Sequence, residues 1–239
     1  MRCEDEKGFL LHARPYGETS LIVDLYTKFF GRVTCVAKGY RRPRKRAVNR
    51  LLIPYVEYSF SWSGRSDLKT LTGAEILGCP EFLREESLYF GLYANELIYR
   101  LILEQDSSES FYEYYKEFVN SLFRRPLCEP LLRKFEIVLL SELGYGLVLD
   151  SEAESGNQLE LDEYYLYVPQ FGLKKVSKKN TKSCLKGRHV LAIANDDWSN
   201  PEVKKAARLI LRSAIDFYLD AKPLHSRKLY RDFKIARLH

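Results

Sequence analysis

Short apolar segments separated by polar turns fill the first 78 residues. These segments are rich in β-branched and aromatic residues, and they cover 8–15, 19–27, 31–39, 51–62 and 67–77. In the second segment Leu21, Val23 and Leu25 occupy alternate positions, as in a strand with one face in water. Five short strands in one such region predict a small closed barrel. The OB-fold is the five-stranded type, and an SH3-like barrel fits the same pattern.

From residue 80 the apolar residues recur every three or four positions, which is typical of helices. Ser107 or Ser108 is suited to cap the second helix, and the third has Pro130 in its first turn and stops at Gly144. The predicted helices cover 87–105, 107–123, 129–143 and 201–219.

The segment between the third and fourth predicted helices is polar and irregular, with one possible strand at 163–169. The sequence thus predicts a multi-domain α and β protein. A five-stranded OB-fold barrel (1–79) precedes a mainly α-helical domain (80–239) with an irregular or β insert at about 150–195.

Export and membrane insertion are not expected from this sequence. No apolar run reaches the roughly 18 residues of a membrane span, and "MRCEDEKGF" has acids where a signal peptide would be apolar. Cysteines do not occur at C-x-x-C spacing, which argues against a disulfide framework or a zinc cluster. We expect a cytoplasmic, nucleoid-associated protein without a metal or cofactor. The five scattered cysteines are Cys3, Cys35, Cys79, Cys128 and Cys184.

Known catalytic motifs are missing from the chain. "AKGYRRPRK" lacks the glycine spacing and the Lys-Ser/Thr pair of a P-loop, and neither G-x-S-x-G nor H-E-x-x-H occurs. Acidic pairs such as Glu85-Glu86 would suit a metal-dependent nuclease only if several carboxylates converged in space. The sequence predicts a protein that is not an enzyme.

A dense basic stretch, "VAKGYRRPRKRAVNR" (36–50), holds seven Lys or Arg residues and no acid. It lies between the third and fourth predicted strands. Such a run is either only a solvated loop or, as we favour, a binding site for a polyanion such as nucleic acid. Four to six phosphate contacts would give a slope of log K against log salt concentration of about −3 to −5. The predicted DNA-binding residues are Lys38, Arg41, Arg42, Arg44, Lys45, Arg46 and Arg50, together with Arg14, Arg65 and Lys69.

Aromatic residues near this stretch could stack on unpaired bases. Each of them could equally belong to the barrel core. They are Tyr16, Tyr40, Tyr55, Tyr58 and Trp62.

Several segments together resemble the RecO family of bacterial DNA repair proteins, in order from about residue 9 to residue 233. They include "LLHARPYGETSLIVDLYTKFFGRVTCVAKGYRRPRKR", "GRSDLKTLTGAEIL", "GLYANELIYRLI", "LLRKFEIVLLSELGYG" and "KPLHSRKLYRDF". The resemblance implies an OB-fold followed by a helical domain. It also implies a recombination mediator of the RecF pathway that binds single- and double-stranded DNA and anneals complementary strands. With RecR, such a protein helps load RecA on DNA coated by single-strand-binding protein (SSB). An RNA-binding OB-fold protein without a role in recombination would share the charge pattern.

The resemblance also implies a site for the acidic, Phe-terminated tail of SSB on the helical domain. Such a tail needs an apolar pocket and a cation for its carboxylates. Arg133 in "LLRKFE" matches the basic position of the family, and Lys134 adjoins it.

One departure from the family concerns zinc. Many members carry two cysteine pairs after the "LGY" motif, whereas this chain has Glu152 and Ser155 at the first pair and Lys175 and Lys178 at the second. We therefore expect no structural zinc, and a segment held by packing instead.

Overall fold

A computed structural model describes residues 2–41, 51–124, 129–177 and 183–237. The chain forms two compact units. The barrel unit comprises Met1–Leu127 and Leu224–His239, and the inserted unit comprises Cys128–Pro223. The sequence prediction divides the chain at residue 79, where strands give way to helices. The two compact units are instead defined by which residues pack together, so they do not test that boundary, which stays a prediction.

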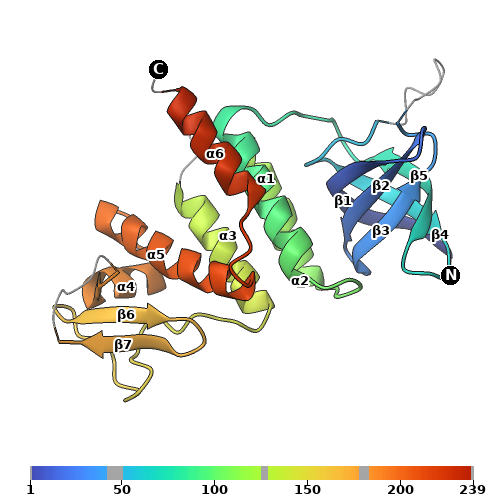
Figure 1. Cartoon of the computed structure of the whole chain (residues 1–239). Coiled ribbons are helices and arrows are strands. Elements are labelled where there is room, and N and C mark those ends of the chain that lie inside the picture. Colours follow the sequence, from blue (N-terminus) through green and yellow to red (C-terminus); the bar gives the residue numbers. More distant parts are fainter. Residues whose placement is uncertain (1, 42–50, 125–128, 178–182, 238–239) are drawn as a thin grey trace. The chain divides into compact units, whose positions relative to one another are not determined.

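Five strands close into a barrel in the order β1-β2-β3-β5-β4 (Figure 1). β3 and β5 pair in parallel, and the other neighbours are antiparallel. This architecture confirms the predicted OB-fold class. The strands are β1 (Arg2–Tyr16), β2 (Ser20–Thr27), β3 (Gly31–Ala37), β4 (Glu57–Ser63) and β5 (Lys69–Ile76).

The barrel interior follows the predicted alternation, but the prediction that the other face of β2 lies in water is wrong. Asp24 and Tyr26 on that face are also buried, Tyr26 against aromatic rings of α2 (Glu109–Leu122). Val23 and Leu25 of β2 are fully buried in one cluster with Phe60 and Trp62 of β4. β1 begins at Arg2 and therefore extends further than the predicted segment at 8–15. Its polar first residues conceal this extension, because most of them face solvent.

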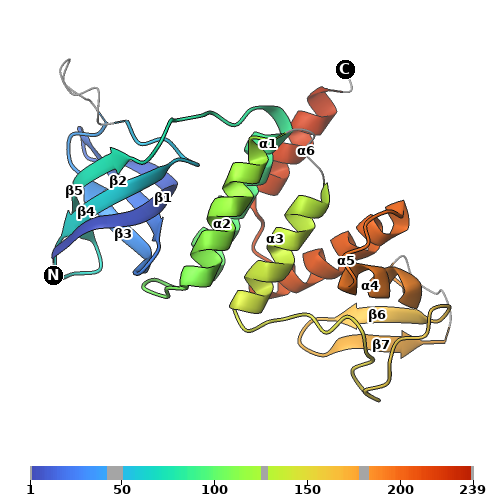
Figure 2. The ribbon, with the colours of Figure 1, turned by 180° about the vertical axis from the view of Figure 1, so that it is seen from behind.

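Three helices complete the barrel unit: α1 (Glu85–Leu101), α2 (Glu109–Leu122) and α6 (His225–Ala236). α1 packs against both α2 and α6, as seen from behind in Figure 2. The predicted cap is confirmed, since Ser108 Oγ accepts a hydrogen bond from the Phe111 amide. At the start of α6, the Glu96 carboxylate of α1 accepts from the amides of His225 and Ser226 at 2.9 and 2.8 Å.

Asn95 joins the helices to the barrel. Its buried amide group donates to the carbonyls of Leu10 and Leu11 at 3.3 and 3.2 Å. Its Oδ1 accepts from the Tyr115 hydroxyl of α2 at 2.5 Å. Because buried polar groups are costly to leave unpaired, these three bonds fix the position of β1 against α1 and α2.

The segment after α1 lies along the edge of β3. The Gln105 amide donates to the Arg32 carbonyl at 3.1 Å, and Glu104 pairs with Arg32 as a parallel bridge. Gly31 makes this approach possible, because its φ is +61° and a Cβ there would collide with the Asp106 carbonyl.

The inserted unit contains a three-stranded antiparallel sheet in the order β7-β6-β8 and three helices. Asn200 caps α5 by accepting from the Glu202 amide at 2.9 Å. The segment expected to be irregular thus holds more regular structure than its composition indicates. The elements are α3 (Glu129–Glu142), β6 (Tyr164–Val168), β7 (Gly172–Val176), β8 (Leu185–Lys186), α4 (Gly187–Ala194) and α5 (Pro201–Tyr218).

Hydrogen bonds hold the loop that follows α3 against β7. Glu152 accepts from Ser155 Oγ at 2.7 Å and from the Lys175 amide at 3.2 Å, and the Ala153 amide donates to the Leu173 carbonyl at 2.8 Å. Polar contacts as well as packing therefore secure this segment. Lys178 lies outside the described residues.

Candidate nucleic-acid interface

Positive charge is concentrated in the barrel strands and their loops. Residues 1–79 hold 14 Lys and Arg against 8 Asp and Glu, and residues 80–239 hold 24 of each. The formal net charge of +6 therefore resides entirely in the first 79 residues. A polyanion would be drawn to this part of the chain.

The described part of the basic stretch begins at the end of β3. Lys38 and Arg41 are both exposed. Arg41 donates from its amide to the Thr19 carbonyl at 3.0 Å and from Nη1 to the Gly17 carbonyl at 2.8 Å, so it joins the basic stretch to the β1–β2 turn. The other predicted residues of this stretch, Arg42, Arg44, Lys45, Arg46 and Arg50, lie outside the described residues.

Arg14 lies on β1, where a buried carboxylate positions it. Its Nη1 is 3.7 Å from Asp24 Oδ2 and 3.4 Å from the Tyr99 hydroxyl, and this hydrogen bond to Tyr99 raises the pKa of Arg14. Asp24 is almost fully buried and accepts from Thr34 Oγ1 at 2.8 Å, and His12 Nδ1 is 3.7 Å from Asp24 Oδ2. The half-exposed Arg14 side chain is thus oriented by its contacts.

Arg65 lies in the loop that leads into β5, and Lys69 is the first residue of β5. Arg65 is exposed, and Lys69 Nζ donates to the Ser66 carbonyl at 2.6 Å. A carbonyl orients an ammonium group without cancelling its charge.

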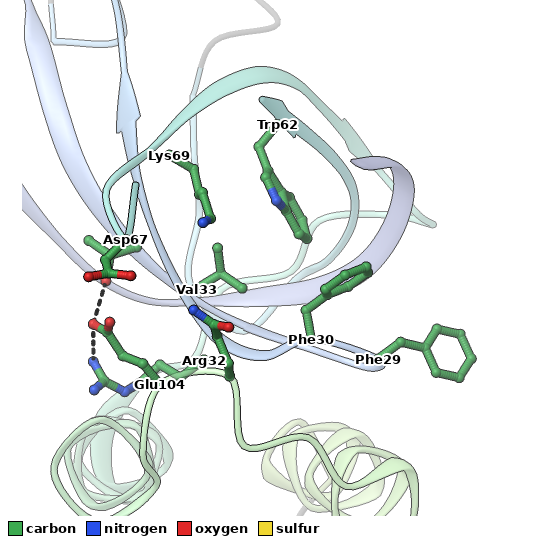
Figure 3. A pocket seen from close by; sticks show the side chains of 10 residues that line it. Phe29, Phe30, Arg32, Val33, Trp62, Asp67, Lys69 and Glu104 are labelled. Carbon is green, nitrogen blue, oxygen red and sulfur yellow. Dashed lines mark hydrogen bonds and ion pairs between the residues drawn. The ribbon is translucent and has the colours of Figure 1, made fainter. Parts of the chain in front are cut away.

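A pocket of about 160 Å³ opens beside Lys69 (Figure 3). Figure 3 shows Trp62 and Phe30 facing this space, while Phe29 points outward. Arg32 and Glu104 lie together at another side, with Arg32 Nη1 3.7 Å from Glu104 Oε1. All the residues that line the pocket belong to the barrel unit: Phe29, Phe30, Arg32, Val33, Thr34, Trp62, Asp67, Lys69, Glu104 and Gln105.

Most of the predicted stacking aromatics are buried. Tyr55, Tyr58 and Trp62 are almost inaccessible, and the Tyr58 hydroxyl accepts from the Ile53 amide at 2.7 Å. Tyr16 is half-exposed, and Tyr40 is partly buried against the core. Phe29, which the sequence reasoning passed over, is 60% exposed at the β2–β3 turn. Two consecutive Phe residues before a turn glycine were the available signal.

The two cations predicted for the SSB tail lie on α3 of the inserted unit. Arg133 is buried, with Nη1 2.8 Å from Glu136 Oε2, and within the described residues its Nε has no hydrogen-bond partner. Lys134 Nζ is exposed and 2.7 Å from Asp196 Oδ2, and this contact lowers the pKa of Asp196. Any acidic ligand would compete with these two carboxylates.

Over the described ranges, no group of three or more His, Cys, Asp or Glu side chains could hold a metal ion. Burial raises the pKa of the Cys3 thiol to about 11 and that of Cys35 to about 12, so both are protonated at neutral pH. None of the described helices is long and apolar enough to cross a bilayer.

Two family models match this chain: "Recombination protein O N terminal" over residues 1–80 and "Recombination protein O C terminal" over residues 86–228. Three similar proteins are each named "DNA repair protein RecO". The protein of Polynucleobacter asymbioticus is 35% identical (98% of each chain), that of Cellvibrio japonicus 36% (96% and 98%) and that of Haemophilus influenzae 38% (96% and 97%). The chain therefore belongs to the RecO family.

Proposed function

We propose that this protein is a mediator of DNA repair and recombination without catalytic activity of its own. It binds single- and double-stranded DNA through the barrel and anneals complementary strands. The observation that carries this proposal is the placement of the whole net charge of +6 in residues 1–79. Most contacts would be to phosphates, so we expect little dependence on sequence.

Three described cations support a DNA-binding role. Arg41 and Lys69 are oriented by backbone carbonyls, and Arg14 by Tyr99 and Asp24. Side chains held in place lose less conformational entropy when they bind a ligand. The predicted DNA-binding set of the first subsection remains our proposal for the interface.

The proposal extends to protein partners. With RecR, the protein would help load RecA on SSB-coated DNA, and the inserted unit would bind the SSB tail through Arg133 and Lys134. Arg133 Nε has no hydrogen-bond partner among the described residues but is buried, so a tail carboxylate could use this donor only after a local rearrangement of α3. Exposed Lys134 would add a second positive charge.

Annealing of SSB-coated complementary strands tests the central claim. We expect the purified protein to accelerate annealing of coated strands, and to bind DNA at least as tightly as RNA of the same length. Preferential RNA binding without annealing would favour the RNA-binding alternative. Cleavage of labelled DNA in the presence of magnesium or manganese would contradict a protein without catalytic activity.

Binding of an SSB tail peptide tests the α3 site. We expect Lys134→Ala and Arg133→Ala each to weaken peptide binding several-fold and to spare DNA binding. Because Arg133→Ala leaves the buried Glu136 without this partner, it also risks destabilising the inserted unit by about 3 kcal/mol. Lys134→Ala carries no such risk, and unaltered peptide affinity in both folded variants would reject the site.

A further inference from the structure

We propose that the pocket beside β3 receives one unpaired base of a bound single strand. This inference rests on the proposed DNA-binding function and assigns a second type of contact to the same barrel. The basic stretch would hold phosphates, and the pocket would hold a base. A protein that anneals strands must hold bases unpaired, and such a pocket serves that need.

One wall of the pocket is the partly buried ring of Phe30, which packs against Trp62. Trp62 itself is only 1% exposed, so a bound base would contact Phe30. Phe30 and Trp62 meet edge to face, with ring centroids 5.4 Å apart and an interplanar angle of 85°. Trp62 belongs to the barrel core, so this wall is rigid. A flat, largely apolar ring is the natural ligand of such a wall, since base–aromatic contacts are favourable for every base.

The rim of the pocket has balanced charge. Lys69 and Arg32 supply two positive charges, and Asp67 and Glu104 supply two negative charges. Arg32 already pairs with Glu104, whereas within the described residues Asp67 has no ion-pair partner. A phosphate or an acidic peptide would be repelled by Asp67. A neutral base could donate an N–H hydrogen, such as the N3–H of thymine, to Asp67 and accept from Lys69 through a carbonyl oxygen.

An open strand edge contributes backbone groups to the pocket. β3 pairs with β5 only at Cys35 and Val36, and with the segment after α1 at Arg32. Val33 and Thr34 lie between these pairings and line the pocket. The base would therefore meet polar backbone as well as side chains on this side.

The pocket lies at a suitable distance from the basic stretch. Thr34 and Lys38 are four residues apart along and just beyond β3, which corresponds to about 13 Å. One strand could therefore place a phosphate at Lys38 and a base in the pocket within a few nucleotides.

Trp62 provides a direct test. The only other tryptophan is Trp198 in the inserted unit, so Trp198→Phe leaves Trp62 as the single reporter. We expect oligo(dT) to change Trp62 fluorescence on binding, and an abasic strand of the same length and charge to bind without that change. Unaltered Trp62 fluorescence with bound oligo(dT) would overturn the pocket assignment. Fluorescence anisotropy of labelled strands in the same samples reports DNA binding separately, so absent binding would instead reject the proposed function.

A variant with unchanged net charge separates base contacts from phosphate contacts. Asp67→Asn with Lys69→Gln removes both charged groups while preserving side-chain size. We expect about a threefold or greater loss of affinity for oligo(dT) and little change for the abasic strand. The matched control is Glu202→Gln with Lys205→Gln, an exposed ion pair on α5, which should alter neither. Equal losses on both strands would make Lys69 a phosphate contact and contradict the base pocket.

Discussion

Two barrel cations of the predicted DNA-binding set, Arg41 and Lys69, have different partners from the cations of the inserted unit. In the inserted unit Lys174, Lys175 and Arg208 each lie within 2.5–2.7 Å of a carboxylate: Glu154, Glu160 and Glu129. In the barrel, Arg2 and Lys28 are also ion-paired, to Glu4 and to Glu109 and Glu113, but Arg41 and Lys69 donate to backbone carbonyls. A carboxylate cancels a positive charge, whereas a carbonyl only orients it. The difference indicates which surface is prepared for a polyanion.

Stability does not explain this difference. Exposed ion pairs of this kind contribute about 0–1 kcal/mol, so pairing in the inserted unit adds little to folding. Its main effect is on the electric field around the molecule. The inserted unit has little net attraction for DNA, and the barrel retains all of it.

The largest effect should come from removing barrel cations. Changing Arg42, Arg44, Lys45 and Arg46 together to Ala should lower affinity for single-stranded DNA by roughly 100-fold at 0.1 M salt. The slope of log K against log salt should become less steep by about 3. Fluorescence anisotropy titrations at several salt concentrations measure both quantities.

A matched variant in the inserted unit controls for total charge. Lys174, Lys205, Arg208 and Arg212 are all ion-paired, and changing them to Ala alters net charge equally. We expect a loss of less than tenfold. Equal losses in the two variants would show that overall charge, rather than its position on the barrel, determines binding.

A smaller, structural effect should distinguish two turn glycines of the barrel. Gly31 and Gly17 have similar φ values of +61° and +59°, but only at Gly31 would a Cβ meet the backbone of Asp106. Gly17→Ala should cost about 1–2 kcal/mol of unfolding free energy from φ alone. Gly31→Ala should cost clearly more in urea unfolding, because the segment after α1 must move. Equal costs would mean that this segment is not firmly packed on β3.

The smallest effect concerns the pH dependence of stability, which should have opposite signs for the carboxyl groups of Glu6 and Glu152. Burial raises the pKa of Glu6 in the barrel. The contribution of the Glu6 carboxyl to stability is therefore fully present below its unfolded-state pKa and is lost as pH rises through its folded-state pKa. The hydrogen bond from Ser155 lowers the pKa of Glu152, so its contribution is present above the unfolded pKa and is lost as pH falls through the folded pKa.

Glutamine variants test these signs by thermal unfolding. At pH 7 we expect Glu6→Gln to raise the Tm slightly, since Gln can still accept from the Phe29 amide, and Glu152→Gln to lower it. Both differences should shrink at acidic pH, where the native carboxyls are protonated. Shifts of the same sign would contradict this assignment.

Periodicity predicted much of the fold, because most elements have one apolar face. The barrel strands and the helices at 129–143 and 201–219 follow this rule. The first residues of β1 and the whole of α6 were harder to predict. Arg2–Lys7 is a polar strand extension with only Cys3 and Glu6 turned inward, and α6 buries only Ser226 among its residues.

The candidate site was only partly predictable. Charge density alone indicated the basic stretch, since no partner in space is needed to recognise it. The pocket depends on segments far apart in sequence, such as Phe30, Trp62 and Glu104, which only the folded barrel brings together. The contacts of Arg14 with Tyr99 and of Arg133 with Glu136 likewise required coordinates.

The return of the chain in α6 has a topological consequence. Because Leu224–His239 belongs to the barrel unit, the inserted unit is attached by two crossings of the backbone rather than one. A single cut in either crossing would leave both halves of the molecule joined through the other. Glu96 holds the start of α6 on α1, so the second crossing is anchored at its exit. A pulling force on the inserted unit would therefore be shared between two attachment points on the barrel unit.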